Sequence, residues 1–239
     1  WNIDEVNPTS IRNLQMNFTG PLPWLKGSYF LSARKFQSDG WMFGREVFLP
    51  GDSSDFSSDN PENWYIESSG DSSWVPMNPE DRLTLQGKIT LRLSDNYKLK
   101  YMVLNQDESW QYYDHRFRLN PQGQYRHEGN RLQQMVTLTH IFSPGTFIDL
   151  NYTNFSNEHD QYVYDDPQDS RYVSPSRLNA TSENAFVSGG MRMWHFYRTT
   201  NTSVFKADLK SQVTDNHLIK TGVEAKLHTM DLEEFQLNV

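Results

Sequence analysis

Two long runs of alternating residues, joined by a very short turn, make up residues 82–106. Within 82–93 an apolar residue or glycine occupies every second position, and polar or charged residues fill the positions between. The chain then turns at 94–96, and a similar alternation resumes from Tyr97. A period of two residues is typical of a β-strand with one apolar and one polar face. The segment therefore predicts an antiparallel hairpin, and it raises the question of which face meets water.

The same pattern recurs along the whole chain. Short turns near 21–26, 143–145 and 214–216 also separate alternating segments, which is typical of β-hairpins. We predict about eight strands, each roughly 10–14 residues long, which exceeds the ~5–6 residues of an ordinary strand. The predicted strands are 11–20, 28–37, 82–93, 97–112, 131–142, 146–157, 202–213 and 217–228.

The connections between successive hairpins are long. They cover roughly 38–80, 114–129 and 159–198, and they are rich in Asp, Ser, Asn, Pro, Gly and aromatic residues. Loops of more than ~12–15 residues are uncommon in compact domains unless they serve a function. Short turns and long loops alternate along the chain, so we expect all turns at one end of the sheet and all long loops at the other.

The composition favours a sheet without a large dry core. Only 36% of the residues are hydrophobic, although 14% are aromatic, whereas a soluble globule has roughly 45–50% apolar residues by a count that includes Gly. Charged residues such as Lys88, Arg92 and Lys206 lie within the predicted strands and need water. These features predict an all-β fold, an antiparallel transmembrane β-barrel with the apolar face toward lipid and the polar face toward a wet lumen. A soluble β-sandwich with the apolar face inside is the alternative.

Charge and cysteine content exclude several classes of protein. The net charge is −8 and no basic run is present, which argues against a nucleic-acid partner. The absence of cysteine excludes disulfides and thiolate metal sites. No stretch approaches the ~18 consecutive apolar residues of a transmembrane helix, and no signal peptide is recognisable.

Four segments of the chain carry a resemblance to a known family. They are FLSARKFQSDGWMFGREVFLPGD (30–52), VPMNPEDRLTLQGKITLRL (75–93), YDDPQDSRYVSPSRLNA (164–180) and SGGMRMWHFYRTT (188–200). The segments resemble the barrel of TonB-dependent outer-membrane receptors, of the kind with an N-terminal carboxypeptidase-regulatory-like domain. The resemblance extends over nearly the whole chain and rests on strand and loop sequences, with no catalytic signature. It implies a barrel of 22 strands, of which residues 1–239 would be a partial barrel without the plug domain.

The resemblance also implies a function. It points to a receptor that takes up a nutrient across the bacterial outer membrane, with no enzymatic activity and no cofactor. The implied partners are outer-membrane lipid, the plug domain of the same full-length chain, the TonB energy-coupling complex and a surface lipoprotein lid. Two other interpretations stay open: a complete eight-stranded outer-membrane barrel, acting as an adhesin or structural protein, and a soluble β-sandwich that binds carbohydrate. A sheet open between its first and last strands would favour a fragment over a closed eight-stranded ring.

Catalytic and metal-binding signatures are not found in the sequence. It contains no HExxH, no GxSxG and no phosphate-binding glycine loop, so we predict neither catalytic nor metal-binding residues. We expect the histidines in or beside the long loops to be separate, exposed imidazoles: His115, His127, His159 and His195. Two acidic clusters have oxygen ligands suited to Ca²⁺, but their spacing matches no EF-hand and we expect solvated loops. The clusters are Asp52, Asp55 and Asp59, and Asp160, Asp165, Asp166 and Asp169.

Aromatic residues of the long loops are the candidate ligand contacts. With Arg and Asp neighbours, aromatic rings offer binding surfaces for sugars, peptides or a protein lid. The alternative is that the rings pack the loops against one another and against the barrel rim. The candidates are Trp41, Phe43, Trp64, Tyr65, Trp74, Tyr164, Tyr172 and Trp194.

Overall fold

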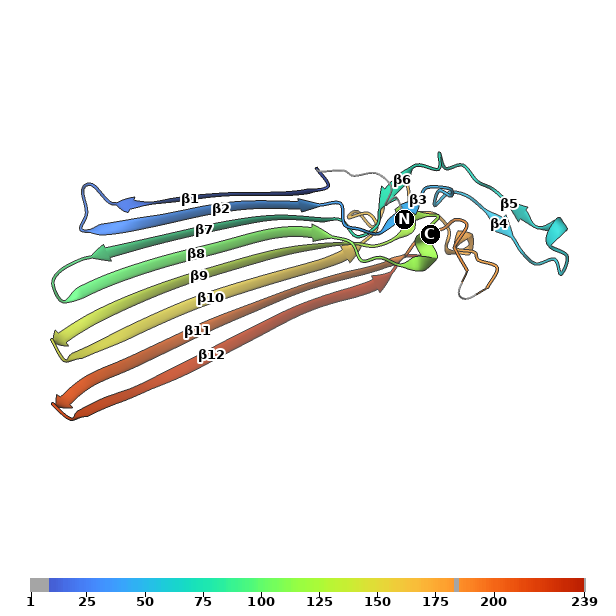
Figure 1. Ribbon diagram of the computed structural model, residues 1–239. Helices are drawn as coiled ribbons and strands as arrows, with labels where there is room; N and C mark the ends of the chain where they lie inside the picture. The colour runs from blue at the N-terminus through green and yellow to red at the C-terminus, as the bar shows by residue number, and fades with distance from the viewer. Residues whose placement is uncertain (1–8, 183–184, 239) are drawn as a thin grey trace.

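A single eight-stranded antiparallel sheet forms most of the molecule (Figure 1). The computed structural model describes residues 9–182 and 185–238. The strands lie side by side in the order in which they occur along the chain, so the sheet is a meander. Its strands are β1 (Ile11–Pro21), β2 (Gly27–Ser38), β7 (Glu80–Arg92), β8 (Tyr97–Trp110), β9 (Arg126–Ser143), β10 (Thr146–Tyr162), β11 (Trp194–Thr214) and β12 (His217–Gln236).

Two short hairpins lie inside the first long connection. β3 (Phe43–Arg45) pairs with β6 (Trp74–Pro76), and β4 (Ser54–Asp55) pairs with β5 (Tyr65–Ile66). Figure 1 shows these hairpins extending away from the sheet. The described residues also form four 3-10 helices: η1 (Pro61–Asn63), η2 (His115–Phe117), η3 (Pro121–Gly123) and η4 (Pro175–Arg177). Among these residues no helix has the length and apolar character needed to cross a bilayer.

The short turns and the long connections lie at opposite ends of the sheet (Figure 1). The turns contain residues 22–26, 93–96, 144–145 and 215–216. The long connections contain residues 39–79, 111–125 and 163–193. Each strand reverses the direction of its predecessor, so the alternation of short and long connections produces this separation, as predicted. We refer below to the turn end and the loop end of the sheet.

Four strands run five to eight residues further toward the loop end than the sequence predicted. β9 begins at 126 instead of 131, β10 ends at 162 instead of 157, β11 begins at 194 instead of 202, and β12 ends at 236 instead of 228. The reason is that the alternation of apolar and polar residues stops before the strands do. On β10, for example, Glu158 and Asp160 lie on the same face as Leu150 and Tyr152. A strand with polar residues on both faces has no periodic hydrophobic signal.

Cross-strand pairing gathers the apolar side chains on one face of the sheet, which we call the apolar face. Leu99 of β8 is opposite Leu91 of β7 and Leu138 of β9, and Leu138 is in turn opposite Leu150 of β10. Thirteen large apolar side chains on this face are between 37% and 71% exposed. They are Leu14, Met16, Phe18, Leu31, Leu85, Ile89, Tyr101, Val136, Leu150, Tyr152, Phe205, Val223 and Leu227.

The other face, which we call the polar face, carries most of the charged strand residues. Lys206 pairs with Asp208 at 3.1 Å, and Lys226 pairs with Glu224 at 2.8 Å. Further polar-face residues are Lys88, Arg92, Lys98, Lys100, Asp149 and Lys210. Toward the turn end the two residue types therefore lie on opposite faces, in agreement with the predicted alternation.

The buried apolar core lies among the long connections and not against the middle of the sheet. One cluster contains Met77, Phe117 and Val187, and a second contains Tyr172, Met191 and Met193. The sheet itself is a single layer, whereas a domain in water normally buries one sheet face against a second layer. β1 and β12 are its edge strands, and within the described residues neither pairs with a second strand.

Candidate functional site

The three long connections pack into one body at the loop end, which we call the loop core. Its central segment, residues 187–191, is buried throughout. Backbone hydrogen bonds join this segment to each of the three connections. They run from Val187 N to Arg116 O (2.9 Å), from Ser188 N to Asn179 O (3.0 Å) and from Gly190 N to Pro50 O (2.9 Å).

Two glycines allow this segment to pass so close to its neighbours. Gly189 and Gly190 have φ values of +151° and +71°, a region in which side chains are strained. A Cβ at Gly190 would lie 2.3 Å from Leu178 N, and one at Gly189 would lie 2.2 Å from Asp52 O. The sequence can therefore form the loop core only with glycine at these positions.

Arg192, directly after the central segment, fixes the second connection to the third. One of its terminal nitrogens lies 2.6 Å from Asp114 Oδ2, and its guanidinium lies 5.0 Å from the ring centroid of Phe117. A charge-assisted contact of this length is among the stronger hydrogen bonds in proteins. The pair joins residues far apart in sequence next to a buried apolar cluster.

Asp52 is buried, with 2% of its surface exposed, and this corrects the expectation of a solvated acidic loop. Its Oδ2 atom accepts hydrogen bonds from Leu49 N (2.9 Å) and Ser69 N (3.0 Å). Burial by itself raises the pKa of this carboxyl. The hydrogen bonds from Ser69 and Leu49 and the positive charge of Arg177 outweigh burial, so the pKa of Asp52 is lowered from 3.8.

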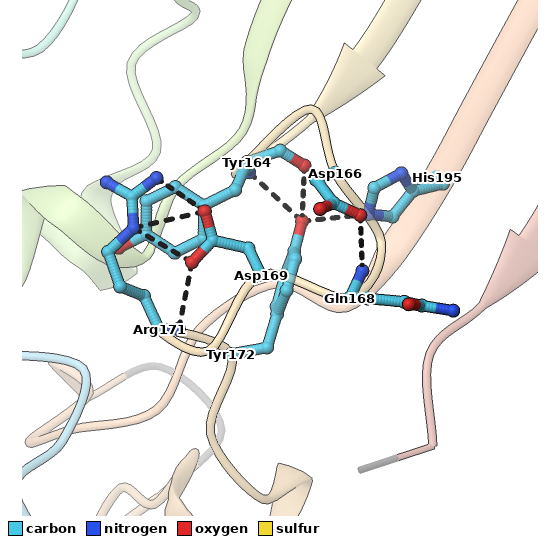
Figure 2. A network of polar contacts seen from close by, with 7 residues as sticks. All are labelled: Tyr164, Asp166, Gln168, Asp169, Arg171, Tyr172 and His195. Atoms are coloured by element: carbon cyan, nitrogen blue, oxygen red, sulfur yellow. Dashed lines mark hydrogen bonds and ion pairs between the residues drawn. The ribbon is translucent and has the colours of Figure 1, made fainter.

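A second polar network ties the third connection to β11 (Figure 2). The Tyr172 hydroxyl accepts from Tyr164 N (3.0 Å), donates to Tyr164 O (2.8 Å) and lies 2.7 Å from His195 Nε2. Because its one proton goes to the carbonyl, this hydroxyl accepts from His195, and Nε2 carries the imidazole proton. His195 Nδ1 lies 2.8 Å from the Tyr197 hydroxyl, which also lies 3.3 Å from Asp165 O. His195 is fully buried and stacks on Phe235 with 5.2 Å between ring centroids.

Asp169 and Arg171 form an ion pair at the surface of the same connection, residues 163–193. Arg171 donates from Nε and one terminal nitrogen to the two oxygens of Asp169, at 2.6–3.2 Å. Its guanidinium also lies 3.8 Å from the ring centroid of Tyr164, a cation–π geometry. Hydrogen bonds from Arg171 lower the pKa of Asp169 to about 2.

Trp110, His127 and His159 stack on the polar face at the loop end. The ring centroids of Trp110 and His127 are 5.3 Å apart, and those of Trp110 and His159 are 5.4 Å apart. His127 Nδ1 lies 3.2 Å from His159 Nε2, and only 8% of His127 is exposed. The expectation of separate, exposed imidazoles is therefore wrong for His127, His159 and His195. His115 Nδ1 lies 2.8 Å from the Tyr113 hydroxyl, which is a hydrogen-bond distance.

Four of the eight candidate ligand contacts are exposed at the loop end. Trp41 is 70% exposed, Tyr65 57%, Trp74 41% and Trp194 37%. The Arg45 guanidinium lies 5.7 Å from the Trp74 ring centroid, and Trp194 Nε1 donates to a Glu234 oxygen at 2.7 Å. These rings combine an accessible aromatic surface with charged neighbours.

The other four candidates hold loops in place. Phe43 begins β3 opposite Pro76. Trp64 packs edge-on against Phe56, with ring centroids 5.3 Å apart, and its Nε1 donates to Ser58 O at 2.8 Å. Tyr164 and Tyr172 belong to the network of Figure 2. The loop aromatics therefore divide into an exposed group and a packing group.

Sequence reasoning did not select Trp110, His195 or Tyr197 as members of a site. Trp110 occurs at the end of a predicted strand, and its two histidine neighbours come from β9 and β10. The one local signal is the alternation of His195 and Tyr197, which places both side chains on one face. In the part of the chain that the structure describes, no group of three or more His, Asp or Glu is arranged to hold a metal ion.

Comparison of the chain with protein families, with curated proteins and with solved structures gives no match. What can be said of function therefore comes from the geometry of the sheet and loops. The sheet presents an uncovered apolar face, and the loop end presents exposed aromatic rings on a packed support. Contacts among the described residues leave much of both surfaces exposed.

Proposed function

We propose that residues 1–239 form part of the wall of a bacterial outer-membrane β-barrel. The full-length protein would be a TonB-dependent receptor, which takes up a nutrient and has no enzymatic activity of its own. In this proposal the apolar face contacts lipid and the polar face lines a water-filled lumen. The observation that carries the proposal is the exposed apolar band, because soluble monomers rarely expose apolar patches beyond a few hundred Å².

The height of that band fits a bilayer. On β7 and the turn after it, the band runs from Leu83 to Leu93, about ten residues, or roughly 34 Å along the strand at ~3.4 Å per residue. With a strand tilt of ~40° this becomes about 26 Å, close to the ~25 Å apolar band of outer-membrane barrels. On β12 the band from Ile219 to Leu227 gives about 21 Å by the same reasoning.

The rest of each long strand would project beyond the membrane. β11 has 21 residues and β12 has 20, whereas ~9–11 residues suffice to cross a bilayer. Barrels of this class have short periplasmic turns and longer extracellular loops. The loop core would therefore stand outside the cell, with Trp41, Tyr65, Trp74 and Trp194 as the candidate ligand contacts.

The two other interpretations have less support. A complete eight-stranded barrel needs β1 to pair with β12, and the two are edge strands of an open sheet in the described residues. An open sheet is what a fragment of a 22-stranded barrel requires. A soluble β-sandwich needs a buried apolar face, but the residues of the apolar band are exposed.

The proposed partners follow from this assignment. Outer-membrane lipid would cover the apolar band, and the plug domain of the full-length chain would occupy the lumen. The TonB energy-coupling complex would act on the plug, and a surface lipoprotein would cover the exposed aromatic rings. No cofactor enters this proposal.

Single-cysteine labelling of the full-length receptor tests the proposal, because residues 1–239 contain no cysteine of their own. A membrane-impermeant maleimide should label Trp41→Cys on intact cells. It should label Asn96→Cys, at a short turn, only after the outer membrane is permeabilised, and it should leave Leu85→Cys unlabelled because lipid covers that face. Labelling of Leu85→Cys as fast as Trp41→Cys, or recovery of the protein in the soluble fraction, would contradict the proposal.

A further inference from the structure

A hollow at the turn end of the polar face is lined by cationic side chains. Its volume is about 390 Å³, and Lys26, Gly27, Ser28, Thr90, Arg92 and Lys98 line it. Three of these residues carry a positive charge and two carry hydroxyl groups, so the lining offers many hydrogen-bond donors and no carboxylate. Such a lining suits an anionic group.

Within the sheet, the charges around this hollow repel one another. Arg92 and Lys98 are direct cross-strand partners on one face, and like charges in that position are destabilising. Neither forms an ion pair within the described residues, unlike Lys206 on the same face, which pairs with Asp208 at 3.1 Å. The sheet therefore places two cations together without supplying an anion.

The positive charge continues along the strands. Lys100 of β8 is opposite Thr90 of β7. Lys88 is the next residue of β7 after Thr90 on the same face, in the direction away from the turn end. Asp95 lies in the turn between Arg92 and Lys98, but among the described residues it forms no ion pair with either. On the strands of this face, Asp149 lies two strands away from Lys98, on β10, and accepts a 2.5 Å hydrogen bond from Thr139 Oγ1. β1 and β2 contain no acidic residue at all. In a chain of net charge −8 this concentration of cations is not a result of composition.

We propose that this basic track, defined as Lys26, Lys88, Arg92, Lys98 and Lys100, binds the carboxylates of an acidic polypeptide segment. The inference rests on the proposed function, in which the polar face lines the lumen, and the segment belongs to the full-length chain outside 1–239. The track is too long for one small anion, because Lys88 and Arg92 are about 13 Å apart along β7 at ~3.3 Å per residue. A single anion contacts only cations within about 4 Å, whereas successive acidic side chains can follow the track.

Zero-length carbodiimide cross-linking tests this directly, because the reagent joins a lysine amine to a carboxylate in contact with it. The full-length receptor in isolated outer membranes is treated, digested and analysed by mass spectrometry. Lys88, Lys98 and Lys100 should form isopeptide bonds to Asp or Glu residues outside 1–239. High salt during the reaction should reduce these links, since the Debye length falls to ~3 Å at 1 M. Lys206 is the matched control and should link to Asp208 in its own strand.

A triple variant gives a second readout. Lys88→Gln, Lys98→Gln and Lys100→Gln together should make the bound segment more sensitive to protease, and Lys206→Gln should not. If Lys206 links to Asp208 while Lys88, Lys98 and Lys100 link to no residue outside 1–239, the inference is overturned. Suppression of the links by inorganic phosphate at constant ionic strength would also overturn it, in favour of a small-anion site. Fractionation of the same cells distinguishes failure of this inference from failure of the proposed function. If only the inference fails, the receptor is still found in the outer membrane; if the proposed function fails, it is missing from that fraction.

Discussion

Replacing Ile89 by arginine should destabilise the assembled barrel strongly. Ile89 lies on the apolar face, opposite Tyr29 and Tyr101, and is 40% exposed. Counted along β7 from Leu83 to Leu93, it lies about 3 Å from the middle of the band, at ~3.4 Å per residue. An arginine at the bilayer midplane costs ~2–4 kcal/mol, or roughly a 30- to 700-fold shift in the folding equilibrium.

Two control variants make this prediction depend on the bilayer. Leu93→Arg, at the edge of the band, should cost only ~0–1 kcal/mol because the penalty falls near the interface. Gln86→Arg places the same new side chain on the polar face of β7 and should leave stability nearly unchanged. The full-length receptor is unfolded with urea in lipid vesicles, and the folded fraction is read from its heat-modifiable migration on gels. Equal urea midpoints for Ile89→Arg and Gln86→Arg, or equal costs for Ile89→Arg and Leu93→Arg, would refute the assignment of the apolar face to lipid.

Three further predictions concern the loop core. Gly190→Val should cost about 1–3 kcal/mol by overpacking against the Leu178 backbone, seen as faster proteolysis of the long loops without loss of the barrel. Tyr172→Phe should cost about 1–3 kcal/mol, because it leaves the buried His195 Nε2 without its hydroxyl partner, and the same proteolysis assay measures it. The lowered pKa of Asp52 means that its contribution to stability is fully present above pH 3.8 and is lost as the pH falls through its folded value. Asp52→Asn should remove that part of the acid sensitivity, and unchanged acid sensitivity would contradict this account.

The sheet could be predicted where its two faces differ in polarity. In 82–93 the apolar set lies on one face and the polar set on the other, and both the strand and its hairpin partner were predicted from that alternation. The start of β11 could not be found in this way, because Arg198 and Thr199 are both polar and lie on opposite faces. The start of β11 is determined by its hydrogen bonding to β12, and this pairing cannot be read from a single sequence.

The loop core could not be predicted from the sequence for a different reason. Its partners come from distant parts of the chain, as with the 2.6 Å contact between the Ser54 and Ser188 hydroxyls or the 2.8 Å hydrogen bond from Asn120 Nδ2 to Gly190 O. Local composition marks Asp52 as a loop residue and says nothing of the backbone that buries it. The aromatic candidates could be found by type, but their division into exposed and packed rings depends on these distant contacts.

The central segment 187–191 also makes the packing of the loop end depend on distant parts of the chain. It contacts all three long connections, yet it follows most of the strands in the chain and leads directly into β11. The first two connections are hydrogen-bonded to each other, from Arg45 N to Arg118 O (2.8 Å) and from Phe48 N to Leu119 O (2.9 Å), but Val187 of the third connection is needed to complete their shared cluster of Met77 and Phe117. A change that displaces the third connection should therefore expose apolar residues of the other two, such as Met77 and Phe117, to chaperones and proteases.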